Sequence, residues 1–235
     1  MNQLIVISGG TKGIGRALVE RFAQAGFDVA TCARDAEALQ QTRQAVEATY
    51  PTIRVHTHRA DVSDPSQAES FVHFVKGIGQ PVSVLVNNAG FFLPGQVHNE
   101  PAGTLERMIT TNLYSAYYLT RGLVGDMVTR RDGYVFTICS IASIVAYPNG
   151  GSYCIAKHAL LGMTKVLREE MKPYNVRVTA VLPGATLTAS WEGVDLPPER
   201  FMKPEDVADA VYGAFALSKQ SVVEELLIRP QLGDI

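Results

Sequence analysis

Two residues with proton-transfer chemistry, Tyr153 and Lys157, stand four positions apart in a segment that is expected to be helical. Residues four apart share one face of a helix, so the phenol and the ammonium should lie close together. An unperturbed tyrosine ionises near pH 10, and a neighbouring ammonium favours the phenolate. Lowering the tyrosine pKa by about three units corresponds to roughly 4 kcal/mol of differential stabilisation. The pair is a candidate acid–base centre, although ordinary amphipathic helices also contain this spacing.

The elements that must position this pair alternate between short apolar runs and longer amphipathic segments. Runs rich in valine and isoleucine between helical segments indicate a parallel sheet covered on both faces. Right-handed crossovers favour a doubly wound, Rossmann-type α/β fold of about seven strands, and residues 1–235 are expected to form one domain. The expected strands are Leu4–Ser8, Asp28–Cys32, Ile53–His58, Val82–Val86, Tyr134–Cys139, Arg177–Leu182 and Val222–Ile228. The expected helices are Gly13–Ala25, Asp35–Thr49, Pro65–Lys76, Leu105–Arg130, Ser152–Met171 and Pro204–Leu217.

One irregular region, residues 184–203, lies between the last two expected strands and contains the single tryptophan, Trp191. A loop of this length in a compact domain is usually functional, so we expect it to border the substrate. Trp191 either covers an apolar pocket together with Phe91, Phe92 and Tyr147, or packs the loop against the domain.

A glycine-rich turn follows the first expected strand and opens the first expected helix. Gly9 can take the tight turn, Gly13 lets the backbone approach a pyrophosphate, and Gly15 lets the helix and strand pack. The free amides at the helix start then face the anion. Glycines at such a turn can also be merely structural, but the position after the first strand favours a dinucleotide site. The residues expected to touch it are Gly9, Thr11, Lys12, Gly13, Ile14 and Gly15.

The end of the second expected strand bears on which dinucleotide is bound. Ala33 occupies the place where an acid would hold the ribose 2′-hydroxyl of NAD. Arg34 follows it, and Lys12 lies in the glycine turn, so two cations favour the 2′-phosphate of NADP(H). Each cation could instead be a solvated surface residue. Asp35 is best explained as the N-cap of the next helix.

These features occur together with Asn87-Asn88-Ala89-Gly90, with Ser140 thirteen positions before Tyr153, and with Pro183-Gly184 followed by Thr188. The set, in this order and spacing, resembles the short-chain dehydrogenase/reductase (SDR) family over nearly the whole chain. The resemblance implies an NADPH-dependent oxidoreductase that transfers hydride between nicotinamide and a ketone, an aldehyde or the corresponding alcohol. A 3-oxoacyl thioester is one candidate substrate.

The resemblance also implies roles for individual residues. Tyr153 would exchange a proton with the substrate oxygen, Lys157 would lower its pKa, and Ser140 would position the carbonyl. Asn112 would hold a water in the proton relay, or it would simply bond the preceding helical turn. Ser143 would contact the substrate. The further implied cofactor contacts are Asp61, Val62, Asn88, Ala89, Gly90, Tyr153, Lys157, Pro183, Gly184, Thr186 and Thr188.

Several alternatives remain open at this stage. Asp61 could simply end its strand in a turn. Arg130 and Arg131 stand near the basic residues of reductases that act on acyl carrier proteins, but cations are also favoured at a helix C-terminus. An NAD-dependent alcohol or sugar-alcohol dehydrogenase and a non-catalytic NADP(H) sensor are the competing functions.

Composition limits the other classes of partner. The chain has 21 Lys and Arg against 23 Asp and Glu, a net charge of −2, so no basic field predicts nucleic-acid binding. The five histidines form no plausible metal-ligand set. The odd number of cysteines, Cys32, Cys139 and Cys154, predicts reduced, buried thiols.

The expected setting is cytoplasmic, because the start of the chain runs directly into a short strand without a signal peptide or membrane span. The segments Leu105–Arg130 and Ser152–Met171 resemble the helix pair through which the family dimerises. The end of the chain, Ile228-Arg229-Pro230-Gln231, departs from the family's tetramer-forming pattern. We therefore expect a homodimer or a homotetramer.

Overall fold

A computed structural model describes residues 2–188, 191, 193 and 195–235. The strands are β1 (Leu4–Ser8), β2 (Asp28–Ala33), β3 (Val55–Arg59), β4 (Val82–Asn87), β5 (Gly133–Ile138), β6 (Val176–Pro183) and β7 (Glu225–Ile228). The α-helices are α1 (Gly13–Gln24), α2 (Ala36–Thr49), α3 (Pro65–Gly77), α4 (Thr104–Ile109), α5 (Ser115–Arg130), α6 (Gly151–Met171) and α7 (Pro204–Ala216).

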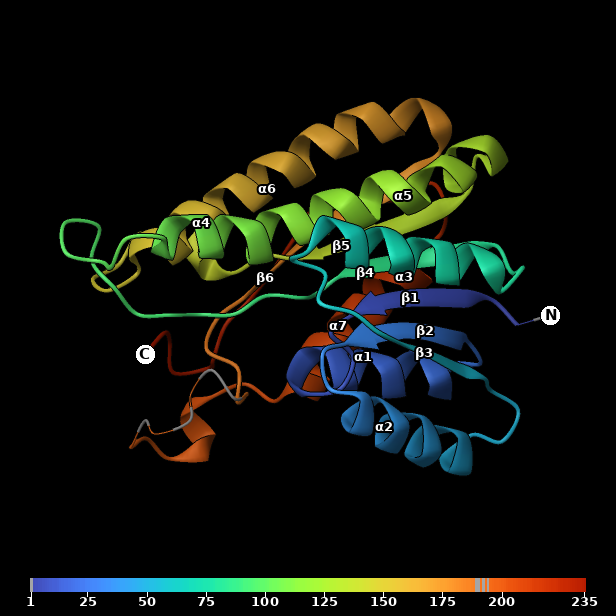
Figure 1. The fold of residues 1–235 in the computed structure, drawn as a ribbon, viewed down its shortest axis with the longest axis horizontal. Helices are drawn as coiled ribbons and strands as arrows, with labels where there is room; N and C mark the ends of the chain where they lie inside the picture. Colours follow the sequence, from blue (N-terminus) through green and yellow to red (C-terminus); the bar gives the residue numbers. More distant parts are fainter. Residues whose placement is uncertain (1, 189–190, 192, 194) are drawn as a thin grey trace.

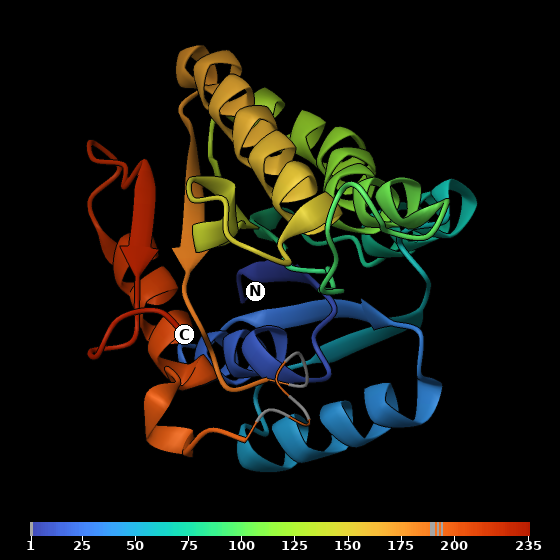
Figure 2. The same ribbon diagram turned by 90° about the vertical axis from the view of Figure 1, so that its left-hand side faces the viewer.

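All seven strands are parallel and form one sheet in the order β3-β2-β1-β4-β5-β6-β7. Helices α1, α2 and α7 lie on one face of the sheet, and α3, α5 and α6 lie on the other (Figures 1 and 2). The strand order reverses between β1 and β4, and in such sheets a ligand binds at the carboxyl ends next to this switch. The expected doubly wound, Rossmann-type α/β fold is confirmed.

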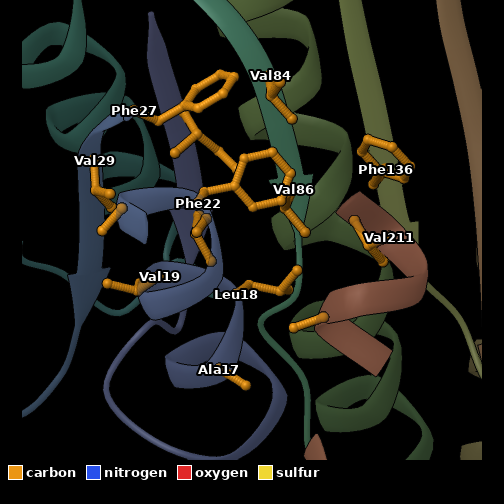
Figure 3. Close-up of a cluster of buried hydrophobic side chains, with 14 of the residues drawn as sticks. Ala17, Leu18, Val19, Phe22, Phe27, Val29, Val84, Val86, Phe136 and Val211 are labelled. Carbon is orange, nitrogen blue, oxygen red and sulfur yellow. The ribbon is translucent and has the colours of Figure 1, made fainter. Parts of the chain in front are cut away.

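The inner strands are mostly apolar because both faces of the sheet are covered. In β1, Ile5 and Ile7 pack in the cluster with α1 and α7, while Leu4 and Val6 pack in the cluster with α3 and α5. Phe22 of α1 is fully buried in the first cluster (Figure 3). Burying a side chain of this size contributes about 1.5–3 kcal/mol to the free energy of folding. Burial of many such side chains therefore stabilises both faces of the sheet.

The helix expected over residues 105–130 is interrupted in the structure. A π-helical turn, Thr110–Tyr114, separates α4 from α5. Asn112 lies within this turn, fully buried, and its Nδ2 donates to the Met108 carbonyl at 3.1 Å. Such single-turn π segments occur frequently at functional sites. The chain is therefore helical from Thr104 to Arg130 as expected, but its hydrogen bonding changes from α to π at the residue predicted to take part in the reaction.

The N-cap predicted for α2 is confirmed. The Asp35 carboxylate accepts from the amides of Glu37 at 2.9 Å and Ala38 at 3.1 Å. Asp35 is therefore occupied by its own helix, as the N-cap preference of aspartate predicts.

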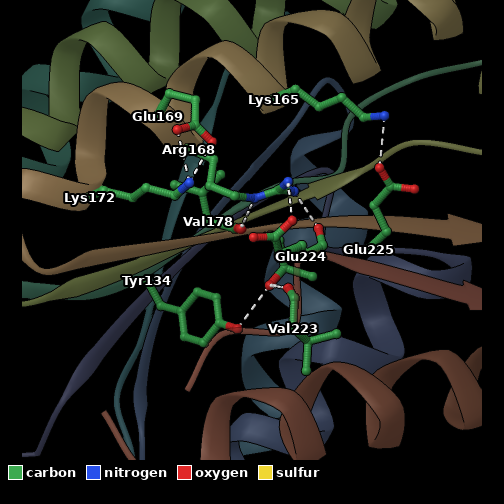
Figure 4. Close-up of polar contacts among 10 residues, drawn as sticks. Tyr134, Lys165, Arg168, Glu169, Lys172, Val178, Val223, Glu224 and Glu225 are labelled. Carbon is green, nitrogen blue, oxygen red and sulfur yellow. Dashed lines mark hydrogen bonds and ion pairs between the residues drawn. The ribbon is translucent and has the colours of Figure 1, made fainter. Parts of the chain in front are cut away.

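Strand β7 begins three residues later than expected, and the residues before it are held to the sheet largely by side chains, beside one backbone bond from the Ala180 amide to the Glu224 carbonyl at 3.0 Å. The Thr179 hydroxyl donates to the Val223 carbonyl, and the Arg168 guanidinium donates to the Glu224 carbonyl (Figure 4). Arg168 is buried on α6, and its Nε also donates to the Val178 carbonyl of β6 at 3.0 Å. These bonds fix the carboxyl-terminal half of α6 to the sheet.

Within the described ranges, no helix combines the length and the apolar character that crossing a membrane would require. Cys32, Cys139 and Cys154 are all buried, free thiols.

Candidate active site

Tyr153 and Lys157 lie on the first two turns of α6, beside the carboxyl end of β5. Lys157 is only 5% exposed, and its Nζ donates to the carbonyl of Ile138, the last residue of β5, at 2.9 Å. The same Nζ is 5.8 Å from the centroid of the Tyr153 ring. The helical spacing therefore places the two side chains together, with the ammonium fixed to the sheet.

Burial controls the ionisation of both groups. Burial raises the pKa of Tyr153 to about 12, and a hydrogen bond with Ser140 opposes this rise. Burial lowers the pKa of Lys157 to about 8, since the charged ammonium is disfavoured away from water. The lowering of the tyrosine pKa expected from the lysine is therefore not seen in the protein alone, where burial raises that pKa.

Ser140 follows β5 and opens a short 3₁₀ turn, Ile141–Ser143. Its hydroxyl accepts from the Ala142 amide at 3.1 Å, and its own amide donates to the Ser143 hydroxyl at 3.2 Å. Ser143 is 2% exposed, and its hydroxyl supports the backbone of Ser140, while its expected contact with the substrate stays a prediction. The turn thus presents Ser140 to the Tyr153 hydroxyl.

Asn112 fastens the segment that follows β4. Its Oδ1 accepts from the Phe91 amide at 3.2 Å, and its Nδ2 donates to the Phe91 carbonyl at 3.1 Å. A Cβ added to Gly90 would lie 2.6 Å from Asn112 Oδ1 and 3.7 Å from Lys157 Nζ, so only glycine lets the chain pass here. Both ends of the Asn112 amide are engaged by protein, which adds a clamping role to the predicted one.

The glycine turn adopts the shape that close approach of a ligand requires. Gly9 has φ +74° and Gly13 has φ +52°, both in the left-handed region. A Cβ on Gly15 would overlap the Gly9 carbonyl oxygen, so glycine at position 15 lets the start of α1 lie directly against the turn. Packing of helix against strand, the role expected of Gly15, belongs instead to Gly10, where a Cβ would overlap the Thr31 hydroxyl.

The remaining turn residues were also predicted to touch the cofactor. Thr11 and Lys12 lie within the turn, and Lys12 is exposed at the N-cap of α1. Ile14, in the first turn of α1, packs partly against the apolar cluster. Of these three side chains, only that of Lys12 carries charge into the solvent beside the turn.

Ser8, which the sequence analysis did not select, joins the ends of β1 and β4. Its hydroxyl accepts from the amides of Asn88 and Ala89, both at 3.0 Å. The Asn88 side chain returns two bonds, donating to the carbonyls of Ser8 at 2.9 Å and Gly9 at 3.1 Å. Asn88 and Ala89 are therefore held against the glycine turn, at the switch point of the sheet.

The segment after β6 reaches the glycine turn from the other side. The Gly184 amide, next to Pro183, donates to the Ile228 carbonyl at 2.8 Å, and the buried Thr186 hydroxyl donates to the Gly184 carbonyl at 3.0 Å. Thr188 lies against the turn, because a Cβ on Gly13 would be 3.0 Å from its Cγ2.

Beyond Thr188, Ala189 and Ser190 of the expected substrate loop lie outside the described residues. The ring of Trp191 contacts that of Phe201 at 5.1 Å between centroids. This contact supports the interpretation that Trp191 packs the loop against the domain.

A cavity of about 240 Å³ lies at the carboxyl ends of β2 and β3, lined by Arg34, Arg59, Asp61 and Gln67. Arg59 pairs with Ala33 in the ladder, and its Nε donates to the Arg34 carbonyl at 3.0 Å. Arg59 was not predicted from the sequence, because its proximity to Arg34 depends on strand register. The sequence did contain one indication, because Arg59 follows the third expected strand, next to the strand that ends at the expected 2′-phosphate site.

Two of the implied cofactor contacts, Asp61 and Val62, have different environments in the structure. The Asp61 carboxylate accepts from the amide and hydroxyl of Ser63 at 3.0 and 2.6 Å, as an aspartate in a turn does. Val62 is buried in the apolar cluster beneath α3. Asp61 borders the cavity, whereas the Val62 side chain belongs to the core.

Two other groups of residues bear on the chemistry. Among the described residues, no cluster of His, Cys, Asp and Glu could hold a metal ion. Arg130 donates to the Val82 carbonyl at 2.6 Å, and Arg131 donates to the Pro173 carbonyl at 2.7 Å. Both arginines thus form bonds that stabilise the fold.

Burial of Lys157 predicts that Lys157→Met stabilises the nucleotide-free protein at neutral pH. Below pH 8 the lysine is protonated in both the folded and unfolded states, and its lowered folded-state pKa removes up to about 3 kcal/mol from the free energy of unfolding. This penalty fades as the pH rises from about 8 to the ordinary lysine value of 10.5. Urea denaturation of wild type and variant between pH 7 and 10.5 measures the difference.

Lys165→Met is the matched control, because Lys165 is half exposed on the same helix and pairs with Glu225 at 2.8 Å. An exposed pair contributes about 0–1 kcal/mol, so this variant should not gain stability. A Lys157→Met protein that is less stable than wild type at pH 7, or a difference that does not shrink with rising pH, would contradict the account.

Comparisons with known proteins agree with this geometry. The family model described as short chain dehydrogenase matches residues 3–197. A sepiapterin reductase of Chlorobaculum tepidum is 31% identical over 242 residues, covering 100% of this chain and 99% of the relative. A 3alpha-hydroxysteroid dehydrogenase of Mediterraneibacter gnavus is 29% identical, covering 89% of this chain and 88% of the relative.

The structure of an alcohol dehydrogenase from Thermococcus sibiricus, complexed with 5-hydroxy-NADP, is similar with a TM-score of 0.93 and 26% identity, covering 100% of this chain and 99% of that one. The structure of the L-sorbose reductase of Gluconobacter frateurii, complexed with NADPH and L-sorbose, has a TM-score of 0.86 and 26% identity. The match covers 97% of this chain and 95% of that one. The chain belongs to the short-chain dehydrogenase/reductase family, whose oxidoreductases interconvert CH–OH and C=O groups.

Proposed function

We propose that the protein is an NADPH-dependent reductase of ketones or aldehydes. The observation that carries the proposal is the placement of Tyr153 and Lys157 on α6, next to Ser140 and across from the glycine turn. Proton donor, carbonyl-positioning serine and dinucleotide turn all lie at the carboxyl edge of one parallel sheet, where this fold binds its ligands.

The residues of the glycine turn fit a dinucleotide. Gly9 and Gly13, both in the left-handed region, place no side chain at two bends of the turn. The N-cap Lys12 makes no side-chain cap bond, so the first amides of α1 could receive a pyrophosphate. Asn88, Ala89 and Gly90 would border the adenosine ribose. When bound, NADPH supplies the hydride, and the protein orients and tunes it.

Proton transfer is the part of the reaction that this chain's own residues perform. Tyr153 donates its phenolic proton to the substrate oxygen while Ser140 holds that oxygen by a hydrogen bond. Lys157, fixed by the Ile138 carbonyl, holds positive charge close to the phenol as the phenolate forms. Pro183, Gly184, Thr186 and Thr188 would contact the nicotinamide end, since this segment lies against the glycine turn.

Preference for the 2′-phosphate of NADP(H) is supported by cations and by the lack of an acid at Ala33. Arg34 and Arg59 border one cavity, and Lys12 is exposed in the nearby turn. A guanidinium binds phosphate through charge-assisted, often bidentate hydrogen bonds. Similar solved structures carry NADP or NADPH, including a metagenomic short-chain oxidoreductase and the L-sorbose reductase.

The substrate side favours an apolar carbonyl compound. The ring of Phe92 packs edge-on against Tyr153 at 5.0 Å, and Ile144, Val145 and Tyr147 expose 43%, 43% and 38% of their surface on the loop before α6. Two of the relatives are named for sepiapterin and for a 3alpha-hydroxysteroid. A similar structure is that of a 3-oxoacyl-[acyl-carrier protein] reductase from Brucella melitensis, but the bonds made by Arg130 and Arg131 argue against a carrier-protein site here.

Assembly as a homodimer remains part of the proposal. Leu105, Tyr114, Tyr117, Ile155 and Val166 expose between 42% and 59% of their surface on α4, α5, α6 and the π-helical turn. Large apolar side chains gathered on neighbouring helices mark a surface that a second copy could cover.

If Tyr153 is the proton donor, Tyr153→Phe should lower the turnover number by at least about 100-fold, because general acid catalysis contributes about 10²–10⁴-fold. NADPH oxidation with a panel of ketones, aldehydes and dicarbonyls measures this loss. Tyr174→Phe is the matched control, since it removes a hydroxyl from an exposed tyrosine in the turn that follows α6, at the end of that helix away from Tyr153. Unchanged turnover in Tyr153→Phe would exclude Tyr153 as the acid, and tight NADPH binding without turnover of any compound would favour a sensor.

If Arg34 and Arg59 bind the 2′-phosphate, Arg34→Ala and Arg59→Ala should each raise the Kd for NADPH by about tenfold or more and leave the Kd for NADH unchanged. Fluorescence titration of both nucleotides gives the two constants. Arg43→Ala, which removes an exposed arginine paired with Glu47 on α2, should change neither. Wild-type protein that binds NADH as tightly as NADPH would overturn the cofactor preference.

A further inference from the structure

The helix that carries Tyr153 has no N-cap side chain of its own. Gly150 occupies the N-cap of α6 and makes no side-chain cap bond. A side chain is excluded there, because a Cβ on Gly150 would overlap the sulfur of Cys154. The first amides of a helix need partners from elsewhere, so the start of α6 depends on another segment.

Glu100 supplies that partner from 52 positions earlier in the chain. Its Oε1 accepts from the Ser152 amide at 2.9 Å, and its Oε2 accepts from the Ser152 hydroxyl. The carboxylate thus lies at the positive end of a 21-residue helix, where a negative charge is favoured. Both carboxylate oxygens are used on the residue that immediately precedes Tyr153.

The surroundings of Glu100 are shaped to the carboxylate. A Cβ on Gly151 would overlap Glu100 Oε1, and a Cβ on Gly95 would lie 2.5 Å from the same atom. The Gly95 amide donates to the Asn149 carbonyl at 3.0 Å, which joins the two loops on either side of the carboxylate. Two glycines therefore leave the space that the Glu100 carboxylate fills.

The segment that ends in Glu100 also touches Tyr153 directly. Its first residue, Phe91, is clamped by Asn112, and its second, Phe92, packs on the Tyr153 ring at 5.0 Å. Residues 91–100 are therefore fixed at both ends, once to the π-helical turn and once to α6. This segment therefore positions Tyr153 in two ways, by contacting its ring through Phe92 and by holding the backbone just before it through Glu100.

We propose that Glu100 is a positioning residue for the reaction, acting through Ser152 to hold the first turn of α6 and with it the Tyr153 phenol. The inference rests on the proposed role of Tyr153 as proton donor. Removing the carboxylate releases the Ser152 amide and lets the first turn fray, and a misplacement of about 1 Å can lower a rate by about 10²-fold.

The test compares Glu100→Ala with wild type by two measurements. Single-turnover reduction of 9,10-phenanthrenequinone should slow by about 10- to 100-fold, while the Kd for NADPH stays within about twofold. Hydrogen–deuterium exchange should show the amides of residues 151–154 exchanging at least about tenfold faster, whether or not this dicarbonyl is reduced. If exchange rises and Tyr153→Phe proves fully active, the positioning stands and the proposed function fails.

Glu100→Gln, which keeps an acceptor for the Ser152 amide, should retain most of the rate and protection. Glu100→Asp, whose carboxylate is one methylene further from Ser152, replaces the alanine variant if that protein does not fold, and it should lose rate and protection in the same direction. Gln96→Ala is the matched control, because it removes a bond to Asn149 Oδ1 in the same segment without touching α6, and it should resemble wild type. Unchanged exchange at residues 151–154 in Glu100→Ala, or equal losses in Gln96→Ala, would overturn the proposal. A loss of NADPH affinity as large as the loss of rate would do the same.

Discussion

The structure depends on one buried contact, the hydrogen bond from the Lys157 ammonium to the carbonyl of Ile138. A lysine that is 5% exposed loses most of its hydration, and a single carbonyl at a strand end replaces only part of it. The contact fixes α6 over the end of β5 and places a potential positive charge beside the Tyr153 ring. Burial of Lys157 thus destabilises the nucleotide-free protein, and it also holds the ammonium next to the proposed proton donor.

The elements around this contact serve to hold strand ends and helix starts together. Ser8 and Asn88 join β1 to β4 at the switch point, Asn112 clamps the segment after β4, and Glu100 caps α6. Each of these bonds links residues distant in sequence through a backbone amide or carbonyl. The carboxyl edge of the sheet is therefore held together through the backbone of several loops. Such an arrangement suits a site that must keep a fixed geometry while a ligand binds.

Periodicity and turn chemistry predicted the sheet, the helices and the N-cap of α2, because these depend on local pattern. The Tyr153–Lys157 pair was also predictable, since a helix brings residues four apart together. Arg59 and Glu100 were not predicted, because their roles arise from strand register and from loop-to-helix contact. The same holds for Ser143, whose burial against Ser140 follows from a 3₁₀ turn. The π-helical turn at Asn112 left no signal, as it keeps the apolar pattern of a helix.

We propose that burial keeps the Tyr153 phenol protonated in the protein alone, and that positive charge close to the ring, from Lys157 and from an oxidised nicotinamide, favours the phenolate. Ultraviolet difference titration of wild type against Tyr153→Phe, with and without NADP⁺, measures this ionisation directly. We expect no phenolate from Tyr153 below about pH 11 in the nucleotide-free protein, where burial raises its pKa to about 12, and a clear fall on binding of the cationic nicotinamide. Ionisation near pH 10 or lower without nucleotide, or a titration unmoved by NADP⁺, would contradict the account.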